Sequence, residues 1–379
     1  MTTFKWGFVG AGMIAKKALY PAISRSNVGE IHAVASRDAD KAMTISPKGK
    51  IYTDYDQLFA DPEVDGVYIS LPNAFHLPVA IRAMKAGKHV LCEKPLGMNA
   101  AEVREAMAVA EKAGLLFVEA SWNRWHPRTQ RIEEIVKSRQ LGAIKRIRAA
   151  FTYDGLDDAN IRLDPTIGGG ILYDLGPYST VAPLWLMDFP EVTELSVQSV
   201  KHRGGVDETT RVNYKLGNTV CETVASCNIP ETSWLIVDGE KGSAKMLGDN
   251  VFNSRHADSK LELTIDGKVS IEHFGPVDPY QVMADNFARK AMGGSDWVMP
   301  LSQSLRFAEL FDAAFAQIKK LLSLSYSCLD HFEDELLFDL PVIGNADGLL
   351  IELEMIHLVA ESIEDICAPW GDQNMFGGT

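Results

Sequence analysis

The feature that most constrains the fold is a glycine turn that begins ten residues into the chain. Gly10-Ala11-Gly12-Met13-Ile14-Ala15 follows a strand-like run at residues 5–10 and opens a helix-like run at residues 13–25. In a dinucleotide-binding fingerprint the first glycine permits a tight turn, the second lets the backbone approach a pyrophosphate, and a small third residue lets the helix pack on the strand. The flanking strand and helix favour this interpretation over a glycine turn in an unrelated βα unit.

Strand-like and helix-like segments alternate after this turn. Short apolar runs predict strands at residues 31–36, 66–71, 89–92 and 115–120, and helical patterns lie at residues 79–86 and 100–113. Such alternation predicts a parallel sheet with helices on both faces, because parallel strands need crossover connections. We therefore expect an α/β fold that begins with a doubly wound Rossmann domain over residues 1–122.

The end of the second predicted strand bears on the choice of cofactor. Enzymes that use NAD usually carry an acidic residue about 20 residues after the glycine turn, where it binds the ribose 2′-hydroxyl. Ser36 and Arg37 occupy that place here, and a hydroxyl with a guanidinium suits a 2′-phosphate better. We expect NADP(H) rather than NAD(H). Asp38, one residue later, leaves NAD open, and an ordinary exposed charge is the alternative for Arg37.

A lysine follows the strand at residues 89–92, in the run Cys92-Glu93-Lys94-Pro95. Ligands of open α/β sheets bind beyond the carboxyl ends of the strands, so Lys94 is placed to bind a cofactor hydroxyl or a substrate oxygen. His76 is expected at the cofactor, but a capping or packing role explains this residue as well. The residues expected at the cofactor are Gly10, Gly12, Met13, Ile14, Ser36, Arg37, Ser70, Leu71, Asn73, His76, Glu93 and Lys94.

A second polar constellation follows three consecutive glycines at residues 168–170. Asp174 and Tyr178 are four residues apart, so on a helix they share one face. Pro177 between them predicts a kink or a late helix start. Polar groups behind a flexible entrance suggest a site, but a core tyrosine and an aspartate at a helix N-terminus explain this segment equally well.

Beyond residue 123 strands follow strands, which predicts a largely antiparallel sheet and an α+β domain over residues 123–320. Asp266-Gly267 lies between two alternating runs and is a strong hairpin signal. Two helical patterns follow the strands. The strands are expected at residues 144–153, 194–200, 209–216, 219–227, 234–237, 243–247, 261–265 and 269–273, and the later helices at residues 278–292 and 302–320.

Charge is distributed unevenly along the 379 residues. Of the net charge of −14, residues 321–379 carry −12, with twelve acidic residues and no Lys or Arg. The rest is almost neutral and has no nucleic-acid footprint. The acidic tail contains an apolar pattern (Leu349, Leu350, Leu353, Ile356, Ile363, Ile366) that suits an amphipathic helix. A basic partner, partial disorder and a shifted reading frame are the open explanations for it.

Other patterns exclude several classes of protein. No apolar run reaches 18 residues, so we expect no membrane span. The chain enters a strand at once with no signal-peptide pattern, and its five cysteines form no CxxC pair. We therefore expect a cytoplasmic protein with no zinc or other metal site.

Several segments resemble the glucose-fructose oxidoreductase/inositol dehydrogenase family, and most closely its dihydrodiol dehydrogenase and NADP-dependent D-xylose dehydrogenase branch. The Glu93-Lys94-Pro95 run and the glycine run with Asp174 and Tyr178 are typical of the family. The Trp122-x-Arg124-x-x-Pro127 element narrows the resemblance to the branch. The matching segments are residues 10–15, 86–97, 99–104, 119–127, 168–178 and 205–209.

The resemblance implies hydride transfer between a nicotinamide and a carbinol or carbonyl carbon of a sugar or cyclic vicinal diol. It makes Tyr178 the acid/base, assisted by Lys94. We expect this ammonium and the positive nicotinamide ring together to lower the pKa of the tyrosine from its ordinary value of about 10. It also implies that Asp174 orients substrate hydroxyls, that Trp122 and Arg124 lie near the substrate, and that the second sheet forms a homodimer or a larger homo-oligomer. Arg162 precedes the glycine run and is a further candidate for the substrate, with an ordinary surface charge as the alternative. A sugar or inositol ketoreductase and a non-enzymatic NADP-sensing regulator are the alternatives.

Overall fold

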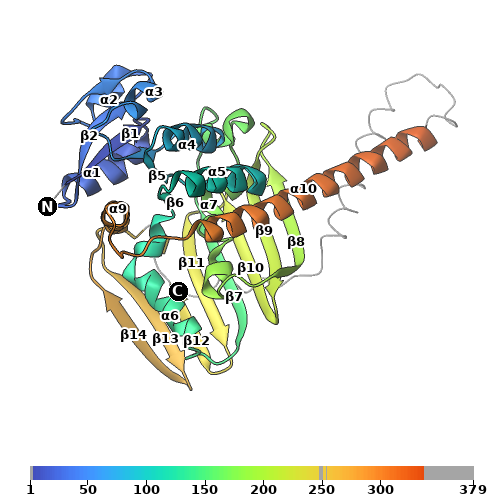
Figure 1. The fold of residues 1–379 in the computed structure, drawn as a ribbon. Helices are drawn as coiled ribbons and strands as arrows, with labels where there is room; N and C mark the ends of the chain where they lie inside the picture. Colours follow the sequence, from blue (N-terminus) through green and yellow to red (C-terminus); the bar gives the residue numbers. More distant parts are fainter. Residues whose placement is uncertain (1–2, 247–250, 253, 337–379) are drawn as a thin grey trace. The chain divides into compact units, whose positions relative to one another are not determined.

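The amino-terminal part of the chain forms a six-stranded parallel sheet in the computed structural model, which describes residues 3–246, 251–252 and 254–336. The strand order is β3-β2-β1-β4-β5-β6, so the order in which strands are added reverses between β1 and β4 (Figure 1). A reversal of this kind leaves a crevice beyond the carboxyl ends of the strands. The strands are β1 (Phe4–Val9), β2 (Gly29–Ala35), β3 (Ile51–Tyr52), β4 (Gly66–Ile69), β5 (His89–Cys92) and β6 (Phe117–Glu119).

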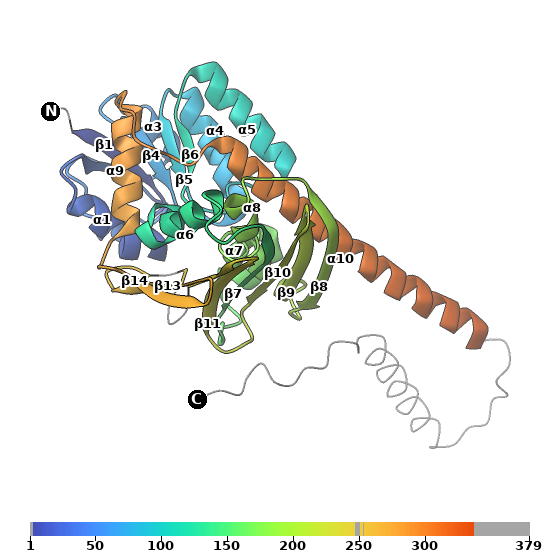
Figure 2. The same ribbon diagram turned by 90° about the horizontal axis from the view of Figure 1, so that it is seen from below.

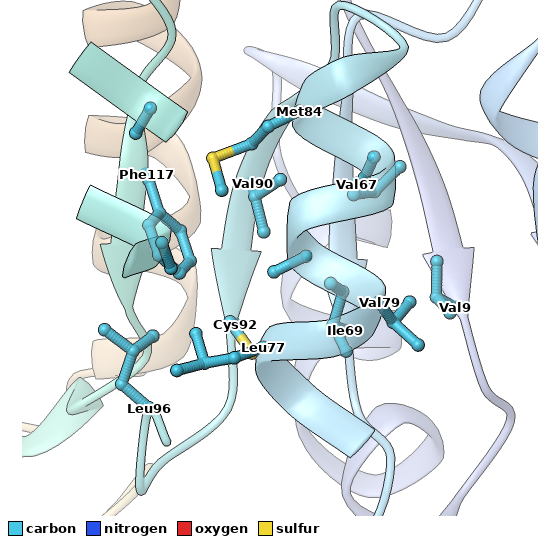
Figure 3. Close-up of a cluster of buried hydrophobic side chains, with 14 of the residues drawn as sticks. Val9, Val67, Ile69, Leu77, Val79, Met84, Val90, Cys92, Leu96 and Phe117 are labelled. Carbon is cyan, nitrogen blue, oxygen red and sulfur yellow. The ribbon is translucent and has the colours of Figure 1, made fainter. Parts of the chain in front are cut away.

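Two helices of this part, α4 and α5, pack on each other and bury one face of β4 and β5. Figure 3 shows Leu77, Val79 and Met84 of α4 against Val67 and Val90 of the strands. The strands are apolar on both faces, as parallel strands covered by helices must be. The helices of this part are α1 (Tyr20–Ser24), α2 (Ala39–Met43), α3 (Tyr55–Phe59), α4 (His76–Lys85) and α5 (Ala100–Ala113).

Helix α5 has the bounds that its sequence predicts because both of its ends are capped. The side chain of Asn99 accepts the N–H of Glu102 at 2.9 Å, which satisfies one of the unpaired donors of the first turn. Gly114 ends the helix in the left-handed conformation, with φ of 64°. The two caps fix where the chain enters β6.

The helix after the glycine turn contains a π-helical turn, η1 (Ala15–Leu19), before α1. Pro21 has no N–H, so it cannot donate to the carbonyl of Lys17 four residues earlier. Arg255 donates to that carbonyl instead, at 2.9 Å. The predicted helix over residues 13–25 is therefore present, and an arginine from a distant loop is bound to its widened turn.

The second sheet has eight strands in the order β14-β13-β12-β11-β7-β10-β9-β8. All neighbours in it are antiparallel except β7 and β10, which are parallel. Asp266 and Gly267 have φ of 48° and 77° and join β13 to β14, which confirms the predicted hairpin. The strands are β7 (Ile144–Thr152), β8 (Val192–Lys201), β9 (Asp207–Leu216), β10 (Thr219–Ser226), β11 (Thr232–Gly239), β12 (Gly242–Met246), β13 (Ser259–Ile265) and β14 (Lys268–Phe274). The predicted fold class is confirmed.

Three helices lie on one face of this second sheet, as Figure 2 shows. They are α6 (Pro127–Lys137), α7 (Ile171–Leu175) and α8 (Ala182–Leu186). Because side chains alternate along a strand, the register places a mixed set of partly exposed residues on the opposite face. Its apolar members are Val220, Val224, Trp234, Ile236, Val269 and Ile271.

Residues 1–321 form one compact unit, which contains both sheets. The last helices return to the first sheet: Phe287 of α9 (Pro279–Ala291) packs on Phe4 and Trp6 of β1, with ring centroids 6.0 and 5.1 Å apart. Ala308 of α10 (Leu301–Leu336) belongs to the same core as β4 and β5. The boundary predicted near residue 122 therefore separates the two sheets. Helices α9 and α10 nevertheless pack on the first sheet, although they come from the second part of the chain.

The acidic tail predicted at residues 321–379 falls only in part within the described residues. Helix α10 extends to Leu336, whereas the apolar pattern between Leu349 and Ile366 lies outside the described residues. None of the helices in the described part of the chain combines the length and the apolar composition that crossing a membrane requires.

Candidate active site

A cavity of about 570 Å³ opens at the carboxyl edge of the parallel sheet. The turns after β1, β4, β5 and β6 form one wall, and β7 with the glycine run before α7 forms the other. Of the residues predicted at the site, those that line this cavity are Gly12, Met13, Ile14, Ser70, Leu71, Asn73, His76, Glu93, Lys94, Trp122, Arg162, Asp174 and Tyr178. The sequence therefore identified residues that the fold brings together from both halves of the chain.

The glycine turn after β1 packs closely against the turn after β4. Gly10 has φ of 89°, and a Cβ atom there would lie 3.1 Å from the carbonyl oxygen of Ser70. An L residue is strained at this φ, so the turn requires glycine. Gly12, Met13 and Ile14 follow it along the cavity wall at the start of the first helix, where backbone N–H groups and the helix dipole favour a bound anion. These features fit a pyrophosphate.

Ser36, Arg37 and Asp38 lie at the end of β2 and do not line the cavity. Arg37 is exposed and makes no ion pair or hydrogen bond within the described residues. The carboxylate of Asp38 caps α2 by accepting the N–H of Lys41 at 3.0 Å, and Ser36 Oγ accepts the N–H of Asp38 at 3.2 Å. The carboxylate of Asp38 is thus engaged by the cap of α2, while the guanidinium of Arg37 has no partner within the described residues.

Asp174 of α7 binds three polar side chains in the cavity. Lys94 Nζ donates to Asp174 Oδ1 at 2.9 Å and to its backbone oxygen at 2.7 Å. Arg162 Nε and the Tyr153 hydroxyl donate to Oδ2, at 2.6 and 3.1 Å. Burial raises the pKa of the Asp174 carboxyl, but Lys94 and Arg162 outweigh it and hold that pKa well below its usual range. Burial lowers the pKa of Lys94, yet the charge of Asp174 and its other neighbours keep it above the ordinary value. Asp174 is therefore an anion and Lys94 a cation.

Tyr178 is buried beside this cluster. The indole N–H of Trp122 donates to its hydroxyl oxygen at 2.8 Å, and Lys94 Nζ lies 5.2 Å from the centre of its ring. Burial raises the pKa of Tyr178 to about 12; Glu93 and Asp174 add to the rise, and Lys94 and Trp122 oppose it. Lys94 thus lowers this pKa, as expected, but burial and two carboxylates outweigh the ammonium, and the expected contribution of a positive nicotinamide ring stays a prediction.

Two other predicted residues bind backbone carbonyls around the site, and a third accepts from a side chain. Both ring nitrogens of His76 lie 2.8 Å from carbonyl oxygens, those of Pro95 and Leu71, so the ring joins the turns after β4 and β5. The Asn73 amide donates to the carbonyl of Gly168 at 2.8 Å. Glu93 accepts the Tyr68 hydroxyl at 2.7 Å. All three line the cavity, but these polar atoms already have partners in the protein.

The glycine run fits tightly between its neighbours and fixes the start of α7. Gly170 has φ of 122°, and a Cβ atom there would lie against Oδ1 of Asp207, closer than van der Waals contact. The other oxygen of Asp207 accepts the N–H of Leu172 at 2.8 Å, in the first turn of α7. Asp207 therefore fixes the start of α7, and α7 carries Asp174, which binds Lys94.

Arg124 does not line the cavity, which corrects its prediction as a substrate residue. Its side chain is buried, its guanidinium pairs with Glu133 at 3.0 Å, and the plane lies over the ring of Trp185 at 4.6 Å. It begins only two residues after Trp122, but the 3-10 turn η3 (Trp122–Trp125) points the two side chains to different surroundings. The closeness of Arg124 to Trp122 in the sequence did not reveal that this turn directs the two side chains apart.

Several residues of the cavity were not predicted. Phe151 and Tyr153 alternate along and just beyond β7, so the strand pattern could have shown that they share a face. Tyr280, at the start of α9, and Glu231, before β11, gave no comparable signal. The unpredicted lining residues are Phe151, Tyr153, Ile161, Ile167, Leu175, Glu231 and Tyr280.

Away from the cavity, His32, Asp61 and Glu63 bring possible metal ligands within 4.8 Å of one another. Both carboxylates have partners in the protein: Asp61 accepts the Tyr52 hydroxyl at 2.9 Å, and Glu63 pairs with Lys5 at 2.6 Å. The expectation of no metal site stays a prediction.

Comparison with known proteins gives the chain its family. Residues 4–120 match the model of the oxidoreductase family with an NAD-binding Rossmann fold, and residues 129–245 match that of the GFO/IDH/MocA C-terminal domain. The chain is 32% identical over 318 residues to D-xylose 1-dehydrogenase (NADP+) 2 of Haloferax volcanii, which spans 82% of this chain and 96% of the relative. It is 34% identical over 251 residues to trans-1,2-dihydrobenzene-1,2-diol dehydrogenase of Mus musculus, and this match covers 64% of this chain and 74% of the relative.

A solved structure supports the same assignment. The 3-ketoreductase of Actinomadura kijaniata, in complex with NADP and TDP-benzene, superposes with a TM-score of 0.77 at 25% identity over 83% of this chain and 98% of that one. These relatives confirm the family that the sequence motifs resemble. The chain belongs to the Gfo/Idh/MocA family and is an oxidoreductase with an NAD(P)-binding Rossmann domain.

Proposed function

We propose that this protein is an NADP-dependent dehydrogenase that oxidises a carbinol of a pyranose sugar or cyclic vicinal diol, with Tyr178 as the acid/base and Lys94 as its partner. The observation that carries the proposal is the meeting of Tyr178, Lys94 and Asp174 in one cavity, beside the glycine turn that fits a dinucleotide. The relatives that act on D-xylose and on a dihydrobenzene diol support this substrate class.

The cofactor half of the proposal rests on the turns after β1, β2 and β4. Gly12, Met13 and Ile14 would hold the pyrophosphate, and Ser36 with Arg37 the 2′-phosphate. Bound at these residues, the nicotinamide accepts or donates hydride and, when oxidised, adds a positive charge. The engagement of Asp38 by the cap of α2 favours NADP(H) over NAD(H), because that carboxylate is not free to accept a ribose hydroxyl.

The ammonium of Lys94 has one free donor in the cavity. It carries three N–H groups, of which Asp174 accepts two, and no acceptor for the third lies among the described residues. Lys94 would donate this hydrogen to a substrate oxygen or a ribose hydroxyl. Since Asp174 already accepts from Lys94, Arg162 and Tyr153, its proposed role is to position these donors.

Tyr178 would exchange a proton with the reacting oxygen of the substrate. A pKa of about 12 leaves its phenol protonated near neutral pH, so it can donate a proton to an alkoxide during reduction. During oxidation it must accept the hydroxyl proton as a phenolate, a form that Lys94 and Trp122 both favour.

The walls of the cavity suit a ring that has one apolar face. Trp122, Phe151 and Tyr280 present aromatic surface, and Arg162 and Lys94 present hydrogen-bond donors. A pyranose or a cyclic diol has this combination of flat C–H surface and hydroxyl groups.

A ketoreductase that works on a sugar or an inositol is the second candidate, and a specific observation favours it. The protonated state of Tyr178 suits reduction, and the solved structure described above is that of a 3-ketoreductase. A non-enzymatic NADP sensor is a further alternative, which the retained pair of Lys94 and Tyr178 disfavours.

A panel of pentoses, hexoses, inositols and cyclic diols, with NADP+ and with NADPH, tests the proposal. We expect turnover of at least one compound and a loss of about 10²- to 10⁴-fold in Tyr178→Phe. Tyr55→Phe in α3, outside the cavity, is the matched control and should behave as wild type. Unchanged turnover in Tyr178→Phe would remove the tyrosine from the mechanism, and tight NADP binding without any turnover would favour the sensor.

We infer a homodimer formed by the second sheet, through the face opposite α6, α7 and α8. That face carries Trp234, Ile236 and Val224 among paired charges such as Arg148 and Asp238, 2.9 Å apart. An apolar patch with charged residues around it is typical of a protein interface. Light scattering should give twice the chain mass, and Trp234→Asp should give a monomer; a monomeric wild type would contradict the inference.

A further inference from the structure

One hydrogen bond joins the aromatic wall of the cavity to the proposed acid/base. The indole Nε1–H of Trp122 donates to the hydroxyl oxygen of Tyr178 at 2.8 Å, and both side chains are buried, with exposed fractions of 3% and 7%. The two rings meet at 65° with their centroids 5.9 Å apart. The bond therefore lies inside the protein, where water competes with it little.

The indole is held in this orientation by a stack on its other side. Trp122 lies at the start of η3, directly beyond β6. Its ring stacks on Tyr280 of α9, with centroids 4.9 Å apart and an angle of 22°. Arg255 covers Tyr280 at 5.0 Å from that ring. Residues from three distant segments thus fix the direction of one N–H group.

The hydrogen bond determines how the remaining atoms of the phenol can be used. A tyrosine hydroxyl has one hydrogen to donate and can accept two, whereas an indole N–H can only donate. Trp122 therefore occupies an acceptor position of the oxygen. The hydrogen of Tyr178 finds no acceptor among the described residues, and Tyr178 lines the cavity. The hydrogen and the second acceptor position are left for a ligand in the cavity.

We propose that Trp122 is a positioning residue for the proton transfer: its indole N–H directs the Tyr178 hydroxyl into the cavity and stabilises the phenolate when the proton leaves. This inference rests on the proposed role of Tyr178 as acid/base. It gives Trp122 a role beyond that of an aromatic surface for the substrate. The proton moves between the Tyr178 oxygen and the reacting oxygen of the substrate, and Trp122 keeps its own hydrogen throughout.

A neutral donor suits this place because the charged groups around Tyr178 shift its pKa in opposite directions. Lys94 and Arg162 favour the phenolate, and Glu93 and Asp174 oppose it. Tyr68 and Tyr280 also interact with it. A hydrogen bond to the charged form lowers a pKa without adding a charge of its own, so Trp122 favours the phenolate over the whole pH range in which these groups titrate.

The pH profile of Trp122→Phe tests the proposal, because phenylalanine keeps a ring on Tyr280 and removes the donor. For oxidation of D-xylose by NADP+, we expect the rising limb of kcat/KM to move to higher pH by about one to two units, the size expected for a hydrogen bond to a charged group. Trp297→Phe removes an exposed indole outside the cavity and leaves the donor; its limb should not move. An unmoved limb in a Trp122→Phe enzyme that melts and binds NADP+ like wild type would overturn the proposal.

A second measurement needs neither turnover nor the Trp122 variant. Seven indole N–H resonances are expected from the seven tryptophans in protein labelled with nitrogen-15 at the indole. In Tyr178→Phe, which keeps the ring and loses the oxygen, one of them should move and exchange faster with solvent. If all seven coincide with those of wild type, the hydrogen bond is absent and the proposal fails. If one moves while Tyr178→Phe keeps full turnover, the bond is present and the proposed function of Tyr178 is what fails.

Discussion

Asp174 holds the ammonium of Lys94 by two of its oxygens, the carboxylate Oδ1 at 2.9 Å and the backbone carbonyl at 2.7 Å. The lysine comes from the turn after β5 and the aspartate from α7, 80 residues later in the chain. Only a rigid junction of the two sheets can keep both distances short. The position of Lys94 relative to Tyr178 is therefore set by the start of α7.

We expect Asp174→Asn to lower kcat by on the order of 100-fold, because Lys94 and Arg162 lose the anion that positions them. Asp174 also raises the pKa of Tyr178, so the rising limb of the oxidation profile should shift to lower pH in the variant. A kcat profile against pH measures both effects. Asp164→Asn is the control, since Asp164 caps η5 (Pro165–Ile167) in the same loop and touches neither cation. A variant with normal kcat would show that Lys94 does not need this anion.

Arg37→Ala should raise KM for NADP+ by about 10- to 100-fold, the loss expected for a hydrogen bond to a charged group. The KM for NAD+ should stay within about twofold, because NAD+ has no 2′-phosphate. Lys48→Ala removes an exposed cation that pairs with Glu30 and should change neither constant. Equal effects on both cofactors would show that Arg37 does not recognise the phosphate.

Gly170→Ala should destabilise the protein more than Gly205→Ala. Both glycines have positive φ, 122° and 90°, which costs an L residue roughly 1–3 kcal/mol. A Cβ atom at Gly170 would also press on Asp207, whereas at Gly205 it meets nothing within 4 Å. Chemical unfolding of the two variants gives the comparison, and equal losses would show that the packing against Asp207 is not tight.

Glu119 should make the stability depend on pH between about 4.5 and 7. It is buried, one of its oxygens has no partner within the described residues, and burial raises its pKa to about 7. The folded protein therefore keeps a proton that the unfolded chain releases, so stability falls as pH rises through this window and stays lower above it. The full difference is on the order of 3 kcal/mol.

Thermal unfolding of Glu119→Gln, which cannot titrate, is the measurement. The advantage of this variant over wild type should grow from pH 5 to pH 8, while the exposed Glu111→Gln should follow wild type at every pH. Parallel curves for wild type and Glu119→Gln would show that Glu119 is ionised when buried.

The sequence predicted those features that depend on neighbours along the chain. The glycine turn, the bounds of α5 and the Asp266-Gly267 hairpin are local, and the structure has each of them. Short elements with weak patterns, β3, α2 and α3, were missed. Arg124 was misplaced, and the rise that burial gives the pKa of Tyr178 was not foreseen, because both depend on burial among distant residues. Trp122 and Tyr178 are 56 residues apart, and no spacing rule predicts a hydrogen bond across that separation.

The packing of Phe287 on Phe4 and Trp6 has a consequence for how the protein is made. The first strand leaves the ribosome about 280 residues before the helix that covers it. Until α9 is synthesised, an aromatic face of the nucleotide-binding sheet stays open to solvent and to other nascent chains. A chain truncated before α9 should therefore aggregate more readily than the full chain.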